Sequence, residues 1–531
     1  MFLFKLFNPY KICKAVFLYS KSQLNFLYYN RLSNNLKSID LSRKIHKKKA
    51  VIELFWKNPN HIFRLWLVCR ALKEIDYTEV IIIIWKRDFF AKIMMKWLKK
   101  AKFIEVEKSI KKQDYEKSKN ILKEVKNYKD FLKLRLEDSI PSYIIYDTIL
   151  KELRHPSPAF DKEYLIKSLA SFLSIYNQVN KIIKHERPEI IFTSHAWKNE
   201  FCSLIFSGIK YDIPVLHITS FCEGLRIKKI NNTLDFKTPV DYLEYNLFLK
   251  LKNKQQNFFI EKGFKELNKR QENLVNDINV RFAYSKKNKL DNSRKNLNSN
   301  TNIKVLVASH AWFDFPHSFG MKNFDNYYDF ILTTYEIAKT TPNIEWYFKP
   351  HPTESWYGGF QLKDLIKDDF KNISITNDNC STSEIMNLCD VVITVHGTIA
   401  VEAGICKKLI ICADNNYFKN WPFVKTATSK SNYINLLNEL KRFKPNENSN
   451  YKLAAACLYG SLSSPTNSSL KPRLRFHCDS LGLNLVNRIN YTLNQETTEI
   501  ENEINRVSNW IENGYTSYAA NQLLDLVEEE L

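Results

Sequence analysis

The chain has 531 residues, more than one hydrophobic core usually organises, so two or more domains are expected. Its 44% hydrophobic and 14% aromatic residues are enough to bury sizeable cores and exclude global disorder. The 79 Lys and Arg outweigh 57 Asp and Glu to give a net charge of +22, which favours an anionic partner: a nucleic acid, an anionic membrane or a phosphorylated substrate.

Residues 1–49 form a basic arm in which lysine and arginine are interleaved with phenylalanine, leucine and tyrosine. Such a segment is typical of contact with anionic lipid, although an ordinary solvated surface has the same composition. Lys5, Pro9 and Lys11 interrupt its apolar start, which lacks the features of a signal peptide, and no apolar run reaches the length of a membrane span. We expect a cytoplasmic protein, peripheral at the inner face of the plasma membrane.

Residues 50–245 alternate short β-branched runs with stretches of helical spacing. The β-branched runs predict strands over 51–56, 79–85, 189–194 and 214–220. The helical spacing predicts helices over 62–75, 164–183 and 201–209. This alternation is typical of parallel βαβ units whose sheet is covered by helices on both faces, so it predicts a first Rossmann-like domain.

Residues 246–301 begin with a charged helical pattern and continue into a polar stretch with almost no apolar residues, which predicts an interdomain linker. A second alternation over 302–440 predicts another Rossmann-like domain. Its expected strands are 302–310, 343–351, 372–376, 390–396 and 407–412, and its expected helices are 327–340, 381–389 and 398–404. Residues 441–531 have a mainly helical pattern and form a predicted C-terminal extension.

One short internal echo links the two predicted domains. TSHAW at 193–197 and ASHAW at 308–312 each close a predicted strand. We expect these strand ends to be equivalent, which modestly favours two similar halves.

The ten cysteines are scattered singly, and many lie in apolar runs. This spacing predicts free or buried thiols in a reducing compartment and no metal site.

The segment WYFKPHPTE, residues 346–354, places a histidine between two prolines at the end of a predicted buried strand. The prolines hold the backbone extended, so Lys349, His351 and Thr353 are predicted to share one face and form a pocket for phosphate oxygens. A proline-stiffened loop with a structural histidine is the alternative. Ligands of open parallel sheets bind at the carboxyl ends of strands, which is where this segment lies.

The segment HGTIAVEAG follows the predicted strand 390–396 directly. Gly397 permits a close turn, Thr398 is predicted to cap the next helix, and the helix start favours a phosphate. His396 could add a hydrogen bond or a charge, and Glu402 could accept hydrogen bonds from a ribose. A plain strand-turn-helix connection with a surface histidine is the alternative.

The strand-Lys-Pro-His-Pro-Thr-Glu segment, followed by strand-His-Gly-Thr-x-x-x-Glu-Ala, resembles bacterial capsule and surface-polysaccharide biosynthesis proteins. This family includes transferases for Kdo, sialic acid and related donors. The resemblance implies an α/β fold of GT-B type, in which two Rossmann-like domains face a cleft, an acceptor domain first and a donor domain second. It also implies a nucleotide-sugar donor, with CMP or CDP activation favoured, a glycan or glycolipid acceptor, and no metal or cofactor.

The resemblance further gives a role to SFCEGLR, residues 220–226. Related transferases place two acidic residues and a glycine here, and a carboxylate acts as the base toward the acceptor hydroxyl. In this chain Cys222 replaces one acid, so Glu223 is the expected base and His351 the second catalytic residue. Arg226 is expected to contact an anionic substrate. Two further histidines, His195 and His310, are expected to line the same cleft.

The leading prediction is a glycosyltransferase that moves a sugar from a nucleotide-activated donor to a growing surface glycan. Two alternatives share the fold: a nucleotide-sugar 2-epimerase, and a non-catalytic factor for polysaccharide assembly or export. Nucleic-acid binding is disfavoured because the sequence contains no RNP, KH, zinc-finger or helix-turn-helix signature.

Overall fold

The computed structural model describes most of both predicted domains. The described residues are 30–41, 48–219, 224–238, 240, 242–275, 280, 283–284, 303–354, 359–367, 370–376, 380–442, 448–462, 483–495, 497–514 and 517–518. The expected base Glu223, the polar linker from 285 to 302 and residues 1–29 and 42–47 of the arm lie outside them.

The N-terminal lobe is built on a six-stranded sheet with the order β5-β3-β2-β6-β7-β8. Five strands are parallel, and β8 is antiparallel to β7 at one edge. The strands are β2 (Lys48–Glu53), β3 (Tyr77–Trp85), β5 (Lys102–Val106), β6 (Ile190–Thr193), β7 (Val215–Ile218) and β8 (Ile227–Ile230). A separate parallel pair joins β1 (Ile39–Asp40) to β4 (Leu98–Lys99).

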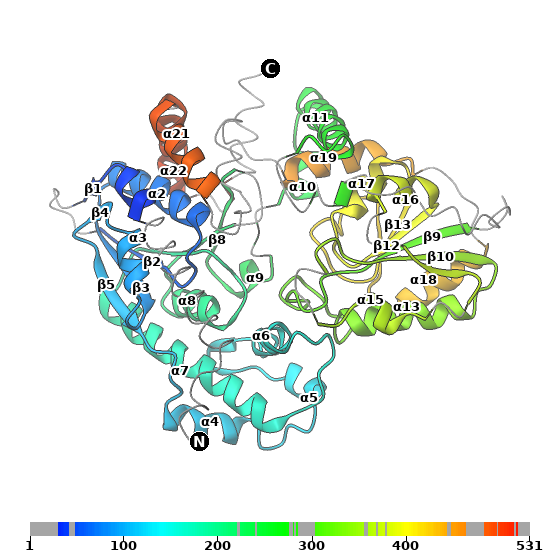
Figure 1. Ribbon diagram of the computed structural model, residues 1–531, viewed down its shortest axis with the longest axis horizontal. Helices are drawn as coiled ribbons and strands as arrows, with labels where there is room; N and C mark the ends of the chain where they lie inside the picture. The colour runs from blue at the N-terminus through cyan, green and yellow to red at the C-terminus, as the bar shows by residue number, and fades with distance from the viewer. Residues whose placement is uncertain are drawn as a thin grey trace, which may run out of the picture.

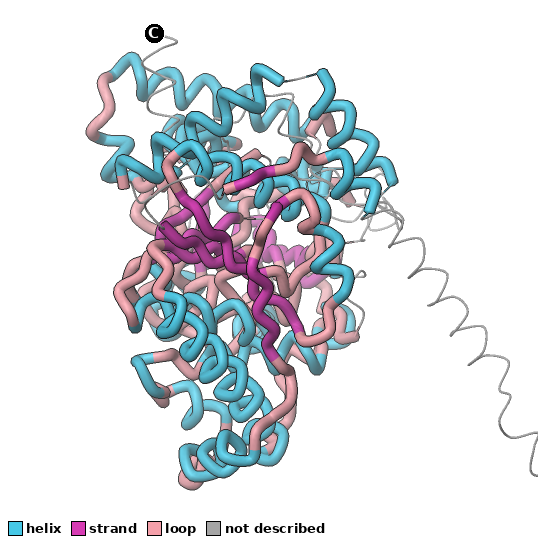
Figure 2. The backbone as a smooth tube through the Cα atoms, turned by 90° about the vertical axis from the view of Figure 1, so that its left-hand side faces the viewer, coloured by secondary structure: helices cyan, strands magenta, loops and turns pink. Residues whose placement is uncertain are grey.

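Helices cover both faces of this sheet because its central strands are apolar on both sides. Along β3, Ile81 and Ile83 enter one buried cluster, and Ile82 and Ile84 enter the other. Figure 2 shows the strands between layers of helices. The helices of this lobe are α2 (Pro59–Glu74), α3 (Phe89–Met94), α4 (Lys112–Ile121), α5 (Tyr128–Leu132), α6 (Tyr143–Leu153), α7 (Lys162–Glu186), α8 (Asn199–Lys210) and α9 (Thr233–Phe236).

The C-terminal lobe carries a second six-stranded sheet, parallel throughout, with the order β11-β10-β9-β12-β13-β14. Its strands are β9 (Ile303–Ala308), β10 (Ile344–Lys349), β11 (Ile373–Ile375), β12 (Val391–Thr394), β13 (Leu409–Cys412) and β14 (Lys425–Thr426). The helices packed around it include α13 (Tyr327–Lys339), α15 (Leu362–Leu365), α16 (Thr382–Leu388), α17 (Ile399–Ile405) and α18 (Lys430–Glu439). The two lobes lie side by side in Figure 1.

The segments outside the two sheets pack on different lobes. The helices α10 (Tyr245–Leu249), α11 (Asn253–Gln271) and α19 (Tyr451–Leu462) cover the C-terminal lobe. The contact between α11 and α19 is close, because a Cβ atom on Gly263 would lie 1.9 Å from the carbonyl oxygen of Ala455. The last helices, α21 (Leu483–Gln495) and α22 (Thr497–Asn513), lie over the N-terminal lobe (Figure 1). There the Ser508 hydroxyl donates to the carbonyl oxygen of Ala71 on α2.

The expected architecture, two Rossmann-like α/β domains facing a cleft with a helical C-terminal extension, is confirmed. In each sheet the strand order reverses once, between β2 and β6 in the first lobe and between β9 and β12 in the second. Ligands of open α/β sheets bind beyond the carboxyl ends of the strands at such a reversal.

The echoed sequences do not close equivalent strands, so that expectation is wrong. TSHAW follows β6, whose place in the sheet order corresponds to β12, whereas ASHAW follows β9, which corresponds to β2. Both segments nevertheless lie at the reversal of their own sheet.

Candidate functional site

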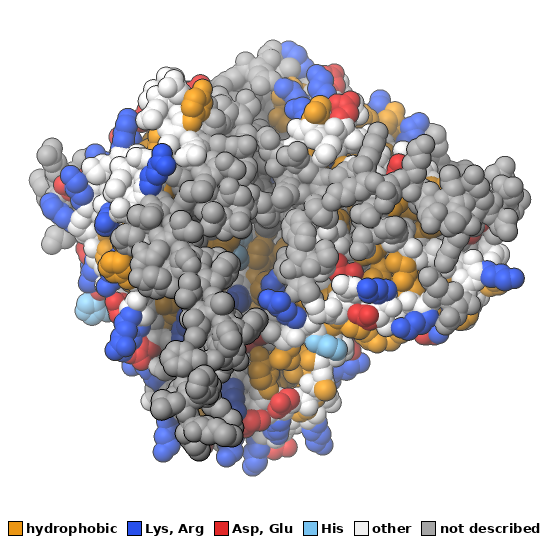
Figure 3. All heavy atoms as spheres, viewed as in Figure 1, with side chains coloured by type: hydrophobic (Ala, Val, Ile, Leu, Met, Phe, Trp, Pro, Cys, Tyr) orange, Lys and Arg blue, Asp and Glu red, His pale blue; other side chains and the backbone are white. Residues whose placement is uncertain are grey.

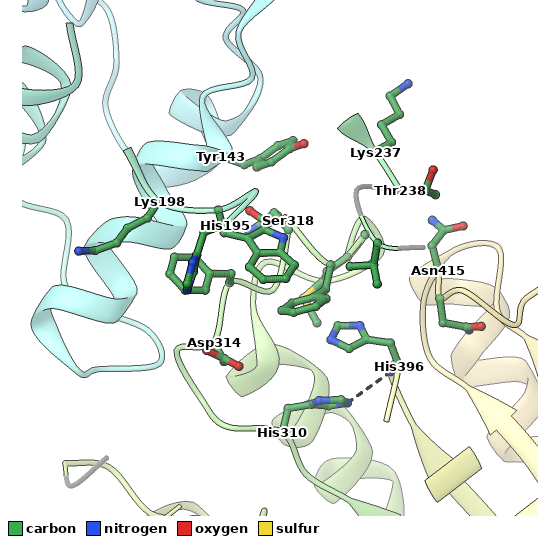
Figure 4. A pocket seen from close by; sticks show the side chains of 18 of the residues that line it. Tyr143, His195, Lys198, Lys237, Thr238, His310, Asp314, Ser318, His396 and Asn415 are labelled. Carbon is green, nitrogen blue, oxygen red and sulfur yellow. Dashed lines mark hydrogen bonds between the residues drawn. The ribbon is translucent and has the colours of Figure 1, made fainter. Parts of the chain in front are cut away.

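A cavity of about 1770 Å³ lies between the lobes and is lined by residues of both. In Figure 4, His195 of the N-terminal lobe lies across this space from His310 and His396 of the C-terminal lobe, and the side chain of Lys198 extends away from them. His195 follows β6, His310 follows β9 and His396 follows β12, so all three histidines lie where a strand order reverses. The fold therefore places this cavity at the point where such sheets bind ligands.

Basic side chains dominate the charged lining, with ten lysines and arginines against four acids. Some are neutralised: the Nζ of Lys151 lies 2.9 Å from Asp314, and that of Lys198 lies 2.9 Å from Glu200. The remaining excess of positive charge favours an anionic ligand. The basic residues are Lys108, Lys129, Lys133, Arg135, Lys151, Lys198, Lys237, Arg270, Lys322 and Lys419, and the acids are Glu200, Glu266, Asp314 and Asp325.

The structure brings most of the residues selected from the sequence onto this one cavity. They are His195, His310, His351, Thr353, His396, Gly397 and Thr398. Lys349, Glu402 and Arg226 do not line it.

Lys349 does not line the cavity with His351, contrary to expectation. Lys349 is the last residue of β10 and lies on the same face of the sheet as Tyr347, where its Nζ donates to the carbonyl oxygen of Cys380 at 2.9 Å. His351 comes after the strand ends, so the strand alternation no longer fixes its direction.

Glu402 is buried and committed to a protein partner instead of facing a ribose. Its Oε1 accepts a hydrogen bond from Arg270 on α11 at 2.9 Å. Arg226 is also fully buried, and it donates to the carbonyl oxygen of Gly460 at 3.0 Å. Thr398 occupies the start of α17, but its own backbone is helical and its side chain makes no capping bond. Glu402 and Arg226 thus stabilise contacts with α11 and α19, respectively.

The ring of His351 is held in one tautomer. The backbone N–H of Thr353 donates to His351 Nδ1 at 3.2 Å, and the Thr353 hydroxyl lies 2.8 Å from the same atom. A backbone N–H can only donate, so Nδ1 accepts and the proton sits on Nε2. His351 therefore offers the cavity an N–H donor.

The tautomers of His310 and His396 also follow from their hydrogen bonds. The backbone N–H of His396 donates to His310 Nε2 at 3.3 Å, drawn as the dashed line in Figure 4, so the His310 proton sits on Nδ1. His396 Nε2 lies 2.5 Å from the hydroxyl of Tyr327, which has no other acceptor among the described residues and so donates. This leaves the proton on His396 Nδ1, a buried donor without a partner in the described part of the chain.

These histidines are neutral at physiological pH. Burial lowers the pKa of His396 from 6.5 to about 3, and burial lowers that of His351 to about 4, against the opposing charge of Asp314. Burial and then His217 lower the pKa of His195 to about 3. His396 and His351 thus present hydrogen-bond donors and no positive charge, and the charge comes from the lysines and arginines.

We predict that the protein loses stability as the pH falls from 7 to 5. The unfolded chain takes up protons on its histidines near pH 6.5, whereas folded His195, His351 and His396 stay neutral until about pH 3–4, so acid favours unfolding. Glu53 has the opposite effect on stability, because burial raises its pKa from 4.5 to about 7. The stability that protonated Glu53 contributes at low pH is lost as the pH rises through 7. Urea unfolding at both pH values measures the balance, and equal or greater stability at pH 5 would contradict it.

Glu53 was not selected from the sequence, yet it supports the N-terminal wall of the cavity. It ends β2, and its Oε1 accepts hydrogen bonds from the backbone N–H and hydroxyl of Ser194 at 2.7 and 2.5 Å. Ser194 Oγ lies 3.3 Å from Nδ1 of His195. A charged residue inside the apolar run VIELFW was the signal that could have identified it.

Asp147 and His317 were also missed. His317 lines the cavity and its Nδ1 lies 2.8 Å from Oδ1 of Asp147, a residue 170 positions away in the sequence. Separation of this size leaves no local pattern, and His317 lies nine residues beyond the end of β9, so it does not share the placement of the strand-end histidines.

In the described part of the chain, no three histidine, cysteine, aspartate or glutamate side chains gather in an arrangement that could hold a metal ion. The seven described cysteines are free thiols: Cys69, Cys202, Cys380, Cys389, Cys406, Cys412 and Cys457. None of the described helices combines the length and the apolar character that crossing a bilayer requires. On the face seen in Figure 3, Lys and Arg side chains of the described residues are spread around both lobes and interspersed with acids.

No protein-family model matches the chain, and no curated protein matches it. Among solved structures, it is similar to the Thermosulfurimonas dismutans KpsC β-Kdo 2,4 transferase, with 13% identity, coverage of 51% of this chain and 80% of that one, and a TM-score of 0.35. It is also similar to the Thermosulfurimonas dismutans KpsC β-Kdo 2,7 transferase, with 13% identity, coverage of 53% of this chain and 80% of that one, and a TM-score of 0.30. A third similar structure is the Methanocaldococcus jannaschii UDP-GlcNAc 2-epimerase in complex with UDP-GlcNAc and UDP. The identity is 15%, the coverage is 77% of this chain and 98% of that one, and the TM-score is 0.26. Likeness at this level carries no argument about the activity of this chain.

Proposed function

We propose that the protein is a glycosyltransferase that moves a sugar from a nucleotide-activated donor to a surface glycan. The observation that carries this proposal is the set of imidazole N–H donors at the reversal of the C-terminal sheet, inside a cavity with a basic lining. Cleaving a sugar–phosphate bond leaves negative charge on the departing phosphate. Fixed hydrogen-bond donors in a water-poor site stabilise such charge well.

The donor phosphates would bind to the C-terminal lobe. His351 would donate through Nε2, and His396 would donate through Nδ1 to a second phosphate or sugar oxygen. Thr353 positions His351 by donating to its Nδ1. Gly397 lines the cavity beside His396, and a Cβ atom there would lie 3.0 Å from Oγ1 of Thr394, so glycine permits the close packing of this turn. The lysines and arginines of the lining would supply the balancing positive charge.

The acceptor would enter from the N-terminal lobe, beside His195 and Trp197. Its reactive hydroxyl needs a base, for which Glu223 is the residue implied by the family resemblance. We assign the acceptor to a surface glycan or glycolipid on the same resemblance, with the reaction taking place at the inner face of the plasma membrane. The basic arm would contact anionic lipid there.

The size of the cavity favours transfer over 2-epimerisation. Pockets for one small molecule usually occupy about 300–1000 Å³. The volume of about 1770 Å³ is large enough for a donor and part of an acceptor chain together. An epimerase acts on one nucleotide sugar and has no need for a second substrate site.

The test is incubation of the purified full chain with CMP-, CDP-, UDP- and GDP-activated sugars, with and without capsule-type oligosaccharides, followed by mass spectrometry. We expect release of the nucleotide together with an acceptor lengthened by one sugar. Formation of an epimerised donor in the absence of an acceptor would reject sugar transfer and show that the protein is a nucleotide-sugar 2-epimerase. Binding of a nucleotide with no change in any donor would replace it by the non-catalytic assembly factor.

A further inference from the structure

A carboxylate–imidazole pair spans the two lobes at the edge of the cavity. Asp147 lies on α6 of the N-terminal lobe, and His317 lies in the segment between β9 and α13 of the C-terminal lobe. Asp147 is fully buried, and its Oδ1 accepts from Nδ1 of His317 at 2.8 Å. Its Oδ2 accepts from the backbone N–H and the hydroxyl of Ser318 at 2.8 and 2.9 Å. Both carboxylate oxygens are therefore held in place.

This arrangement fixes which nitrogen of His317 can accept a proton. A carboxylate has no proton to donate, so the Nδ1 of His317 carries the hydrogen and Nε2 keeps its lone pair. The Nε2 atom makes no hydrogen bond with any of the described residues, and the side chain lines the cavity. The ring of Tyr143 stacks on the imidazole with centroids 6.2 Å apart, and Figure 4 shows Tyr143 and Ser318 on the same side of the space.

We propose that His317, in place of the Glu223 that the family resemblance implies, is the general base that takes the proton from the acceptor hydroxyl, and that Asp147 is its positioning residue. The inference rests on the proposed sugar transfer. As the acceptor oxygen bonds to the anomeric carbon, its proton moves to Nε2 of His317. The bond between the anomeric carbon and the phosphate oxygen breaks, and its electron pair leaves with the phosphate.

The other histidines of the cavity are less suited to this role. His351 presents an N–H to the cavity, and His396 uses Nε2 to accept from Tyr327. His195 has a hydroxyl as its partner at 3.3 Å, and burial lowers its pKa to about 3, so it takes up a proton poorly. Among the described residues that line the cavity, His317 is the one histidine hydrogen-bonded to a carboxylate. Since its two members come from different lobes, the pair exists only while the lobes are in contact.

Three variants show whether the Asp147–His317 pair acts as a base or only holds the two lobes together. In His317→Asn the side-chain amide can still donate to Asp147, but nothing occupies the position of Nε2. In Asp147→Asn the new amide can donate to Nδ1 and so place the imidazole proton on Nε2. Tyr146→Phe is the matched control, because the Tyr146 hydroxyl accepts from Asn326 across the lobes at 3.2 Å and neither residue lines the cavity.

We expect the turnover number for transfer to fall about 100- to 10,000-fold in both His317→Asn and Asp147→Asn. The dissociation constant for the nucleotide should stay unchanged. Tyr146→Phe should stay within about twofold of the unsubstituted protein. In a fourth variant, His317→Gly, the whole ring is removed, and added imidazole should restore part of the turnover. Normal turnover in His317→Asn would overturn the inference while leaving the proposed function intact. Equal losses in Tyr146→Phe and His317→Asn, accompanied by lower melting temperatures, would show a structural tie and also overturn it. Failure of the unsubstituted protein to transfer sugar would instead reject the proposed function and the base together.

Discussion

Replacing His351 with alanine is expected to lower the turnover number for sugar transfer about 100- to 1,000-fold, the effect of losing one fixed donor to a developing anion. The reason is geometric: Thr353 fixes the imidazole so that Nε2–H is the atom offered to the cavity. Initial-rate kinetics at saturating donor and acceptor measure the loss. Because the interaction strengthens as charge develops on the phosphate, the Michaelis constant for the donor should change much less.

Two further substitutions distinguish a hydrogen-bond donor from an acid or base. The amide nitrogen of glutamine can reach the position of Nε2, so His351→Gln should keep more turnover than His351→Ala. The shorter asparagine reaches only the position of Nδ1, so His351→Asn should resemble alanine. His185 lies outside the cavity with its side chain 81% exposed, and His185→Ala is the matched control that should leave the rate unchanged. Equal activity in His351→Ala and the unsubstituted protein would contradict the role.

Replacing Glu402 with alanine is expected to lower the free energy of unfolding by about 3–5 kcal/mol, the usual effect of leaving one member of a buried ion pair unpaired. Glu402 lies on α17 and Arg270 on α11, and their side chains are only 5% and 9% exposed. Burial opposes the charge on Arg270, but Glu402 and Glu266 outweigh it and raise the pKa of the guanidinium. Without Glu402 the cation stays buried beside one weaker partner. Urea unfolding measures the change.

The matched control is Glu266→Ala, which removes the other carboxylate of Arg270. Glu266 lies 3.2 Å from the guanidinium and its side chain is 24% exposed, so its loss should cost about 1 kcal/mol or less. The double variant Arg270→Leu/Glu402→Leu should recover much of the lost stability, because no charge is left unpaired. A loss below about 1 kcal/mol in Glu402→Ala would show that water reaches Arg270 and would contradict the buried pair.

The central part of each sheet could be predicted because buried parallel strands are continuous β-branched runs. Tyr77–Trp85 and Val391–Thr394 have this character and no polar interruption at their centres. The strands that were missed lie at or near the sheet edges. Lys102–Val106 is partly exposed along most of its length, and Ile227–Ile230 carries two lysines, so neither has the pattern of a buried strand.

The location of the site could be predicted, but its detailed contacts could not. Topology alone brings the strand ends after β9 and β12 together, so His310 and His396 could be placed from their sequence positions. A shift of one residue in the strand alternation would turn the side chain of Lys349 to the other face of the sheet. Its hydrogen-bond partner, the carbonyl oxygen of Cys380, lies 31 residues away in the sequence. The partner of Glu402 lies 132 residues away. Contacts of this range follow from packing, which no local pattern records.

The most direct test of the central claim is calorimetric titration of the full chain with CMP, CDP, UDP and GDP, repeated for His351→Ala and His396→Ala. The claim is that the imidazole donors of the C-terminal lobe meet on the phosphate of one nucleotide-activated donor. It predicts that at least one of the four nucleotides binds, and that each substitution weakens its affinity about tenfold, or about 1.4 kcal/mol. Absence of binding by all four nucleotides, or equal affinity in the three proteins, would contradict the claim.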